Sequence, residues 1–177
     1  MSDTILLVED EESDVEIFML AAKEVRFENP IQVVKDGQEA MDYFSGTGKY
    51  FDRERFPLPA LVLLDLKLPY RMGMVVLHWV RTQSKFKSII VVVFTSSENA
   101  LDISKAYEEG ANAYLVKPPT LEGLGYLIRN LKNFWLNPDM RRPQWAVKNL
   151  KTVPFLSQAA VLKKITADHP RETYGKN

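Results

Sequence analysis

The chain has 177 residues, of which 46% are hydrophobic and 26% charged, as is typical of a globular protein with one main domain. It has no cysteine and two histidines, His78 and His169, which excludes disulfides and thiolate sites and disfavours a multi-histidine metal site. No apolar run approaches the roughly 20 residues of a membrane span, and the acidic N-terminus does not resemble a signal peptide, so we expect a cytoplasmic protein.

Charge is unevenly distributed along the chain, although the formal net charge is zero. Residues 1–137 include 15 basic and 20 acidic residues, whereas residues 138–177 include 8 basic and 3 acidic residues. We therefore divide the chain into a main domain, 1–137, and a basic, partly helical C-terminal extension, 138–177. The extension either remains solvated or docks on its own domain, a partner or nucleic acid. Its two short predicted helices cover residues 144–151 and 157–166.

The first half of the chain alternates apolar runs of strand length with segments of helical periodicity. The predicted strands cover residues 4–8, 31–34 and 60–64. The first and third are continuously apolar, which indicates strands covered on both faces. A helix over 14–26 is expected to start from a capping box of Ser13 and Glu16, and a shorter helix is expected around Phe44. Residues 45–59 contain glycines, prolines and charges, which indicate a surface loop.

The second half of the chain continues the same alternation of strands and helices. The predicted strands are 89–94 and 113–116, and the predicted helices are 74–84 and 98–109. We expect Ser97 to cap the second of these helices and Gly110 to end it. A last helix begins at Thr120 and carries an apolar stripe to Trp135. Five strand–helix units predict a doubly wound α/β fold with a parallel sheet.

Polar residues follow four of the five predicted strands where each strand ends. They are Glu9 and Asp10 after the first strand, Asp65 after the third, Thr95 and Ser96 after the fourth, and Lys117 after the fifth. If the strand order is 2-1-3-4-5, three carboxylates converge beside a hydroxyl and an ammonium group. Such carboxylates repel one another unless a cation lies between them, and hard oxygen ligands suit Mg²⁺. The sequence therefore predicts a magnesium-assisted phosphoryl site.

Four segments, in this order, resemble the receiver domains of bacterial two-component response regulators. They are LLVED at 6–10, LLDLKLP at 63–69 with Gly73, FTSS at 94–97 and GANAYLVKP at 110–118. The resemblance covers about residues 3–136, and the long loop before the third strand and residues 133–136 are most similar to phytochrome-associated, single-domain response regulators. It implies a flavodoxin-like, doubly wound (βα)5 fold with a five-stranded parallel sheet of order 2-1-3-4-5.

The resemblance also implies which residues carry out phosphorylation and bind the metal ion. Asp65 would be the phosphoacceptor, because a carboxylate nucleophile forms an acyl phosphate without a separate base. Mg²⁺, or Mn²⁺ in its place, would be bound by Glu9, Asp10, Asp65 and the backbone carbonyl of Lys67. Glu9 is one methylene longer than the aspartate that is common in the family, so it would bind the metal through water.

A second group of residues would bind the phosphoryl oxygens and respond to them. The resemblance implies that Thr95, Ser96 and Lys117 contact the phosphoryl group, and that Tyr114 turns inward when Thr95 moves. It further implies a cis peptide bond before Pro118.

The resemblance implies a signalling switch rather than an enzyme. A sensor histidine kinase, such as a phytochrome, would donate the phosphoryl group, and the face formed by the fourth helix, fifth strand and fifth helix would bind an unknown downstream partner. We expect a homodimer that pairs through the fifth helix and part of the extension, with no specific nucleic acid or membrane partner. One alternative is a phosphatase that forms an aspartyl-phosphate, but that class has a D-x-D motif and a cap domain, whereas the first strand here ends in Glu9-Asp10 and no insertion is long enough for a cap. The other alternative is a DNA-binding regulator, whose output domain would be larger than the extension.

Overall fold

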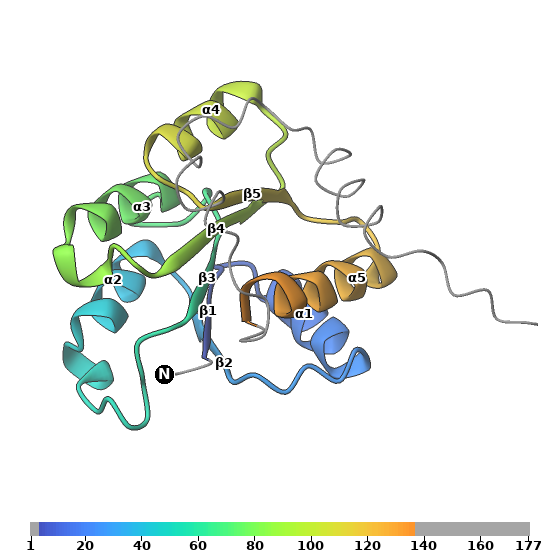
Figure 1. Cartoon of the computed structure of the whole chain (residues 1–177), viewed down its shortest axis with the longest axis horizontal. Helices are drawn as coiled ribbons and strands as arrows, with labels where there is room; N and C mark the ends of the chain where they lie inside the picture. Colours follow the sequence, from blue (N-terminus) through green and yellow to red (C-terminus); the bar gives the residue numbers. More distant parts are fainter. Residues whose placement is uncertain (1–3, 137–177) are drawn as a thin grey trace, which may run out of the picture. The chain divides into compact units, whose positions relative to one another are not determined.

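The computed structural model describes residues 4–136, in which five parallel strands form one sheet with helices on both faces (Figure 1). The strands are β1 (Ile5–Val8), β2 (Ile31–Val34), β3 (Leu61–Leu64), β4 (Ile90–Thr95) and β5 (Ala113–Val116). The longer helices are α1 (Glu12–Glu24), α2 (Gly37–Ser45), α3 (Gly73–Thr82), α4 (Ala100–Glu108) and α5 (Leu121–Leu131). Short helical segments in the same range are η1 (Gly48–Tyr50), η2 (Ser84–Phe86) and η3 (Lys132–Leu136). The strand order is 2-1-3-4-5, which confirms the predicted doubly wound fold.

Helices cover both faces of the sheet, with α1 and α5 on one face and α2, α3 and α4 on the other (Figure 1). Successive side chains of a strand point to opposite faces, so β1 contributes to two hydrophobic cores. Ile5 and Leu7 pack with Phe18 of α1 and with α5, whereas Leu6 and Val8 pack with α2 and α3. The continuous apolar run of β1 therefore reflects burial on both faces, as predicted.

The register of the sheet brings the ends of the central strands to the same level. Val8, the last residue of β1, pairs with Leu64, the last residue of β3. The backbone N–H of Asp65 donates to the carbonyl of Val8 at 3.1 Å, so Glu9 and Asp65 leave the sheet side by side. On the other side of β3, β4 runs on to Thr95, whose carbonyl accepts from the Lys117 N–H at 2.9 Å. The polar residues predicted at the strand ends therefore share one edge of the sheet.

Two predicted helix caps are wrong. Helix α1 begins at Glu12 with Glu11 as its N-cap, so Ser13 lies inside the helix, where it cannot take the extended backbone of a capping residue. Helix α4 begins at Ala100, and the cap is Asn99, whose side chain accepts from the N–H of Leu101 at 2.8 Å. Ser97 instead lies in the loop that leads into this helix.

The predicted surface loop over 45–59 is folded against the domain. Tyr50, in η1, is buried, and its ring lies 5.0 Å from those of both Tyr43 and Phe56. The Arg53 guanidinium donates to the backbone carbonyls of Tyr43, Phe44 and Phe56. Because the last carbonyls of α2 lack partners within the helix, Arg53 satisfies groups that would otherwise need water.

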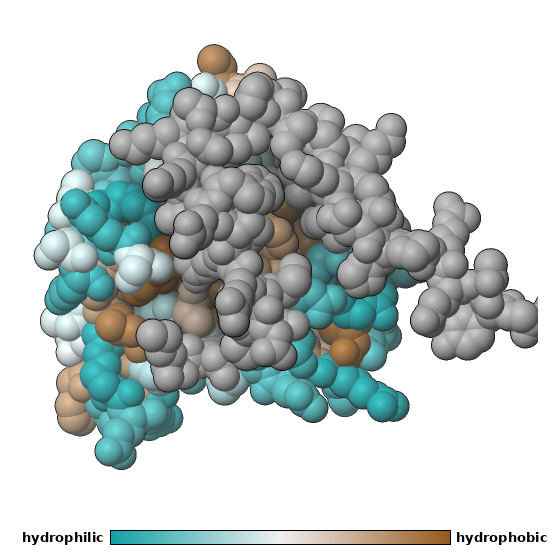
Figure 2. All heavy atoms as spheres, viewed as in Figure 1, coloured by the Kyte–Doolittle hydropathy of each residue, from teal (hydrophilic) through white to brown (hydrophobic). Residues whose placement is uncertain are grey.

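The remaining predictions concern the helix ends, membrane-spanning helices and the C-terminal extension. Gly110 has a positive φ of 94° after α4, as expected, whereas α5 begins at Leu121, one residue after its predicted start, with Thr120 as the N-cap. On the face seen in Figure 2, the surface of the described residues is largely hydrophilic with smaller hydrophobic areas. None of the helices in residues 4–136 is long and apolar enough to cross a membrane. The extension over 138–177, with its two predicted helices, lies outside the described residues.

Candidate functional site

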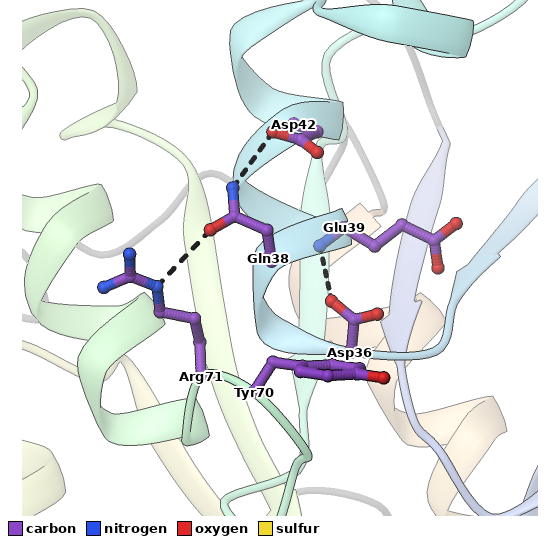
Figure 3. Close-up of a pocket in the computed structure, with 6 residues that line it drawn as sticks. All are labelled: Asp36, Gln38, Glu39, Asp42, Tyr70 and Arg71. Carbon is purple, nitrogen blue, oxygen red and sulfur yellow. Dashed lines mark hydrogen bonds between the residues drawn. The ribbon is translucent and has the colours of Figure 1, made fainter.

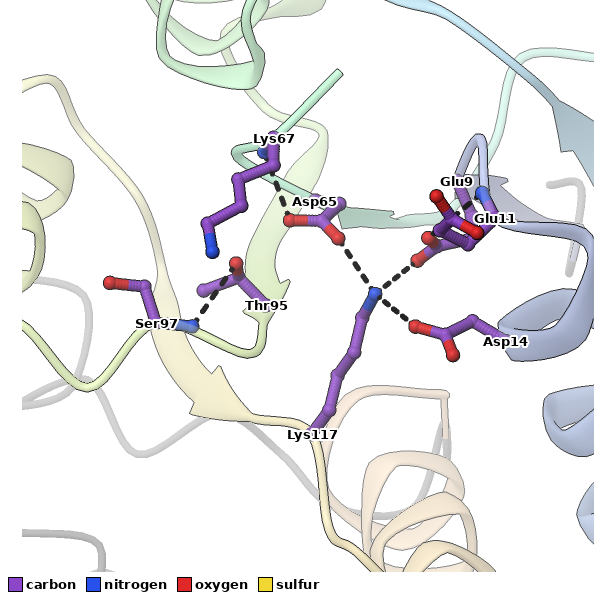
Figure 4. Close-up of polar contacts among 8 residues, drawn as sticks. All are labelled: Glu9, Glu11, Asp14, Asp65, Lys67, Thr95, Ser97 and Lys117. Atoms are coloured by element: carbon purple, nitrogen blue, oxygen red, sulfur yellow. Dashed lines mark hydrogen bonds and ion pairs between the residues drawn. The ribbon is translucent and has the colours of Figure 1, made fainter.

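Lys117 is the centre of the polar cluster at the ends of the strands (Figure 4). Its ammonium nitrogen lies 2.7 Å from Asp65 Oδ2, 2.6 Å from Glu9 Oε2 and 2.7 Å from Asp14 Oδ2. Glu9 follows β1, Asp65 follows β3 and Lys117 follows β5, whereas Asp14 is in the first turn of α1. The fold thus joins three of the residues predicted at the strand ends and adds one carboxylate from a helix.

The cluster places three carboxylates beside one ammonium group, and the Glu9 carboxyl is also largely shielded from water. Burial raises the pKa of this carboxyl from 4.5 to about 7, against hydrogen bonding and attraction by Lys117, and the negative charges of Asp65 and Asp14 raise it further. Burial would lower the pKa of the Lys117 ammonium, but its hydrogen bonds to Asp14, Asp65 and Glu9 raise it above the ordinary value. A further cation next to these three carboxylates would reduce their mutual repulsion and favour their ionised forms.

Asp65 lies just after the carboxyl end of β3, where backbone groups as well as Lys117 contact it. Its Oδ1 accepts from the backbone N–H of Lys67 at 3.1 Å, which leaves Oδ2 to Lys117. The first turn of α3 lies directly behind the residue. A Cβ added to Gly73 would lie 1.9 Å from the backbone carbonyl oxygen of Asp65, so only glycine allows this approach. Asp65 is 5% exposed, so it is buried among the residues at the strand ends.

Thr95 and Tyr114 form a second set of contacts next to the cluster. Thr95 is fully buried, and its Oγ1 accepts from the backbone N–H of Ser97 at 3.5 Å. The Tyr114 ring is buried, and its hydroxyl donates to the backbone carbonyl of Ser97 at 3.0 Å. Both residues therefore contact the loop that enters α4. Ser96, predicted to bind the phosphoryl group, is exposed at the end of β4.

The predicted metal ligands lie at the same edge of the sheet but do not form a closed site. Asp10 directly follows Glu9 and is half-buried, and Lys67 is exposed beside Asp65. Within residues 4–136, no three histidine, aspartate or glutamate side chains are grouped so that they could bind a metal ion. The donors nevertheless fit a hard divalent cation, because all of them are oxygens and three carboxylates at this edge share one ammonium group.

Asp14 is the site residue that the sequence analysis missed. The predicted helix began at residue 14 and α1 begins at Glu12, so Asp14 lies in the first turn in either case, and its side chain points toward the strand ends (Figure 4). The sequence contains one indication of this role: Asp14 follows Asp10 by four residues in an acidic segment. That signal is weak because a run of acidic residues is more often a solvated helix start.

Two other features do not join the cluster. An open hollow of about 500 Å³ is lined by residues at the start of α2 and by Tyr70 and Arg71 (Figure 3). Its Asp36 side chain caps α2, so part of its charge has a structural role. His78 is exposed on α3 and lies 2.6 Å from Glu109, consistent with a surface residue.

One implied backbone feature is wrong. No peptide bond in residues 4–136 is cis, so the bond before Pro118 is trans, the lower-energy isomer of most X–Pro bonds.

Comparisons with known proteins match most of the described residues. A family model described as the response regulator receiver domain matches residues 5–129. Response regulator Rcp1 of Synechocystis sp. is 36% identical over 132 residues, which cover 75% of this chain and 88% of Rcp1. The structure of the phosphorylated cyanobacterial phytochrome response regulator RcpA superposes with a TM-score of 0.70 at 33% identity, covering 77% of this chain and 96% of RcpA. The Mn²⁺-bound form of Rcp1 superposes with a TM-score of 0.66 at 32% identity, covering 88% and 99% of the two chains.

Proposed function

The chain belongs to the response regulator receiver domain family of two-component signalling, and on this premise we propose that it is a switch phosphorylated on Asp65. The observation that carries the proposal is the 2.7 Å contact between Asp65 Oδ2 and the Lys117 ammonium, at the edge where three strands end. The contact places the ammonium group beside the carboxylate, where it can offset the negative charge of an incoming phosphoryl group.

The proposed reaction transfers a phosphoryl group from a phosphohistidine of a sensor histidine kinase. An Asp65 carboxylate oxygen attacks the phosphorus, the new O–P bond forms as the N–P bond breaks, and the leaving imidazole takes up a proton. Lys117 offsets the negative charge of the phosphoryl oxygens, and Thr95 donates its hydroxyl proton to one of them. Similarity to phytochrome response regulators, RcpA among them, makes a phytochrome the kinase that we favour.

A divalent cation completes the proposed site. Glu9, Asp10, Asp65 and the backbone carbonyl of Lys67 would bind Mg²⁺, with Mn²⁺ as the alternative suggested by the Mn²⁺-bound form of Rcp1. When bound, such an ion would neutralise the carboxylates and the phosphoryl oxygens together. Glu9 supports this assignment because burial and neighbouring charge raise its pKa to about 7, and a bound cation would favour its ionised form.

The proposed output runs through Thr95 and Tyr114 to the face formed by α4, β5 and α5. Tyr114 lies in β5 and its hydroxyl contacts the loop before α4, so a shift of Thr95 toward a phosphoryl oxygen would act on that loop. Exposed apolar side chains on this face, including Leu101 and Tyr107, support a protein partner. The homodimer, the cytoplasmic location and the absence of a specific nucleic acid partner stay predictions.

Phosphorylation by acetyl phosphate in the presence of Mg²⁺ tests the proposal. We expect intact-mass spectrometry to show the gain of one phosphoryl group in the natural protein. The Asp65→Asn variant should fold and gain none, because the amide has the same shape but is a poor nucleophile. A phosphorylated Asp65→Asn variant would refute the assignment of the phosphoacceptor.

A further inference from the structure

The Lys117 ammonium has as many carboxylate partners as it has hydrogen-bond donors. An ammonium carries three N–H bonds, and three carboxylates lie within 2.7 Å of this one. Two of the partners, Glu9 and Asp65, are buried, with side chains 2% and 6% exposed. Asp14 approaches from α1, and its side chain is 39% exposed. The third donor is therefore directed at a residue on the open side of the cluster.

We propose that Asp14 is a positioning residue that holds the Lys117 ammonium in place for phosphoryl binding, an inference that rests on the proposed function. The other two carboxylates have assigned tasks, since Asp65 would become the acyl phosphate and Glu9 would bind the divalent cation. Asp14 is the one of the three partners that keeps its free carboxylate when both events occur. It anchors one N–H of Lys117 and leaves another directed at a phosphoryl oxygen on Asp65.

The geometry explains why a lysine needs such an anchor at this position. The ammonium is a point charge on four rotatable carbons, and fixing it costs rotamer freedom that a strong partner must offset. Lys117 is only 14% exposed in its side chain, so water supplies few alternative partners. The Asp14 carboxylate offers a charged hydrogen bond from a helix that is fixed against α5 by the core residues Phe18 and Ala22.

Rates of phosphorylation by acetyl phosphate and Mg²⁺ provide the first readout. Because a partly exposed charged hydrogen bond is lost, we expect Asp14→Ala to slow phosphorylation about 5-fold, and Asp14→Asn, which keeps an oxygen acceptor, to slow it less. Glu16→Gln is the matched control: it removes the same charge from an exposed position on α1 and should leave the rate unchanged. An unchanged or faster rate in Asp14→Ala would overturn the proposal.

The second readout follows Lys117 itself and does not depend on phosphorylation. In metal-free protein labelled with ¹⁵N on its lysines, the Lys117 ammonium signal can be assigned by its loss in Lys117→Met. We expect its protons to exchange with water faster in Asp14→Ala than in the natural protein or in Glu16→Gln. Equal exchange in all three proteins would show that Asp14 does not hold Lys117. Should the natural protein fail to be phosphorylated, the proposed function fails, while this measurement still decides the role of Asp14.

Discussion

The substitution Gly73→Ala tests how closely the start of α3 packs against the backbone of Asp65, the proposed phosphoacceptor. An alanine Cβ at this position would lie 1.9 Å from the backbone oxygen of Asp65 and 2.9 Å from Cα of Leu66, and contacts below 3.0 Å are essentially never seen. The obstacle is backbone, so a rotamer change cannot relieve it and the helix must move by about 1 Å. Overpacking of this kind costs about 3 kcal/mol, which corresponds to a melting temperature about 10 °C lower in a chain of this length.

Urea unfolding of Gly73→Ala and of Gly48→Ala separates this collision from backbone strain. Gly48 has a φ of 58° but no atom within 4 Å of its added Cβ, so alanine there should cost only about 1 kcal/mol for the left-handed backbone. Gly73→Ala should lose about three times as much and should also be phosphorylated more slowly, because Asp65 is displaced. Equal losses in the two variants, or a loss below about 0.5 kcal/mol in Gly73→Ala, would refute the reasoning.

Three further predictions address the metal, the pH dependence and the assembly. Asp10→Ala should weaken Mg²⁺ binding about 10-fold in calorimetric titration, because one negative ligand is lost. Unchanged affinity would show that Asp10 does not bind the metal ion. Burial raises the pKa of Glu39, but its hydrogen bonds from Lys49, the Lys35 N–H and Tyr50 outweigh this and lower it below 4.5. Glu39→Gln should therefore lower the free energy of unfolding by about 1 kcal/mol at pH 7, as measured by urea unfolding. This difference should vanish as the pH falls through the lowered pKa, because the side chain at position 39 is then uncharged in both proteins. A difference that stays constant with pH would contradict the prediction. Light scattering should find a dimer for the full chain and a monomer after truncation at Asn137, whereas two monomers would exclude the predicted dimer.

The sheet and most of the site were predictable because they depend on local signals. Continuous apolar runs mark strands buried on both faces, and a parallel sheet brings the residues after such strands to one edge. Asp65 and Lys117 stand directly after β3 and β5, so the strand order puts them at the same end of the sheet, and the long Lys117 side chain reaches past β4 to within 2.7 Å of Asp65.

Asp14 could not be predicted in the same way because its role depends on a contact between residues far apart in the sequence. The apolar stripe of α1 places Phe18 and Ala22 in the core as predicted, but the partner of Asp14 is Lys117, 103 residues away, and no local pattern links the two. Local sequence does not decide between Ser97 and Asn99 as the cap of α4, since both residue types are good caps and they are two positions apart. The docking of Arg53 on α2 depends on contacts made only in the folded chain.

The central claim is that Asp65 carries the phosphoryl group, and mapping the modified residue tests it most directly. Borohydride reduces an acyl phosphate of aspartate to homoserine, which peptide mass spectrometry then locates. After treatment with acetyl phosphate and Mg²⁺, we predict homoserine at position 65 in the natural protein and at no position in untreated protein. Reduction at another residue, or a phosphoryl group that borohydride does not remove, would contradict the account.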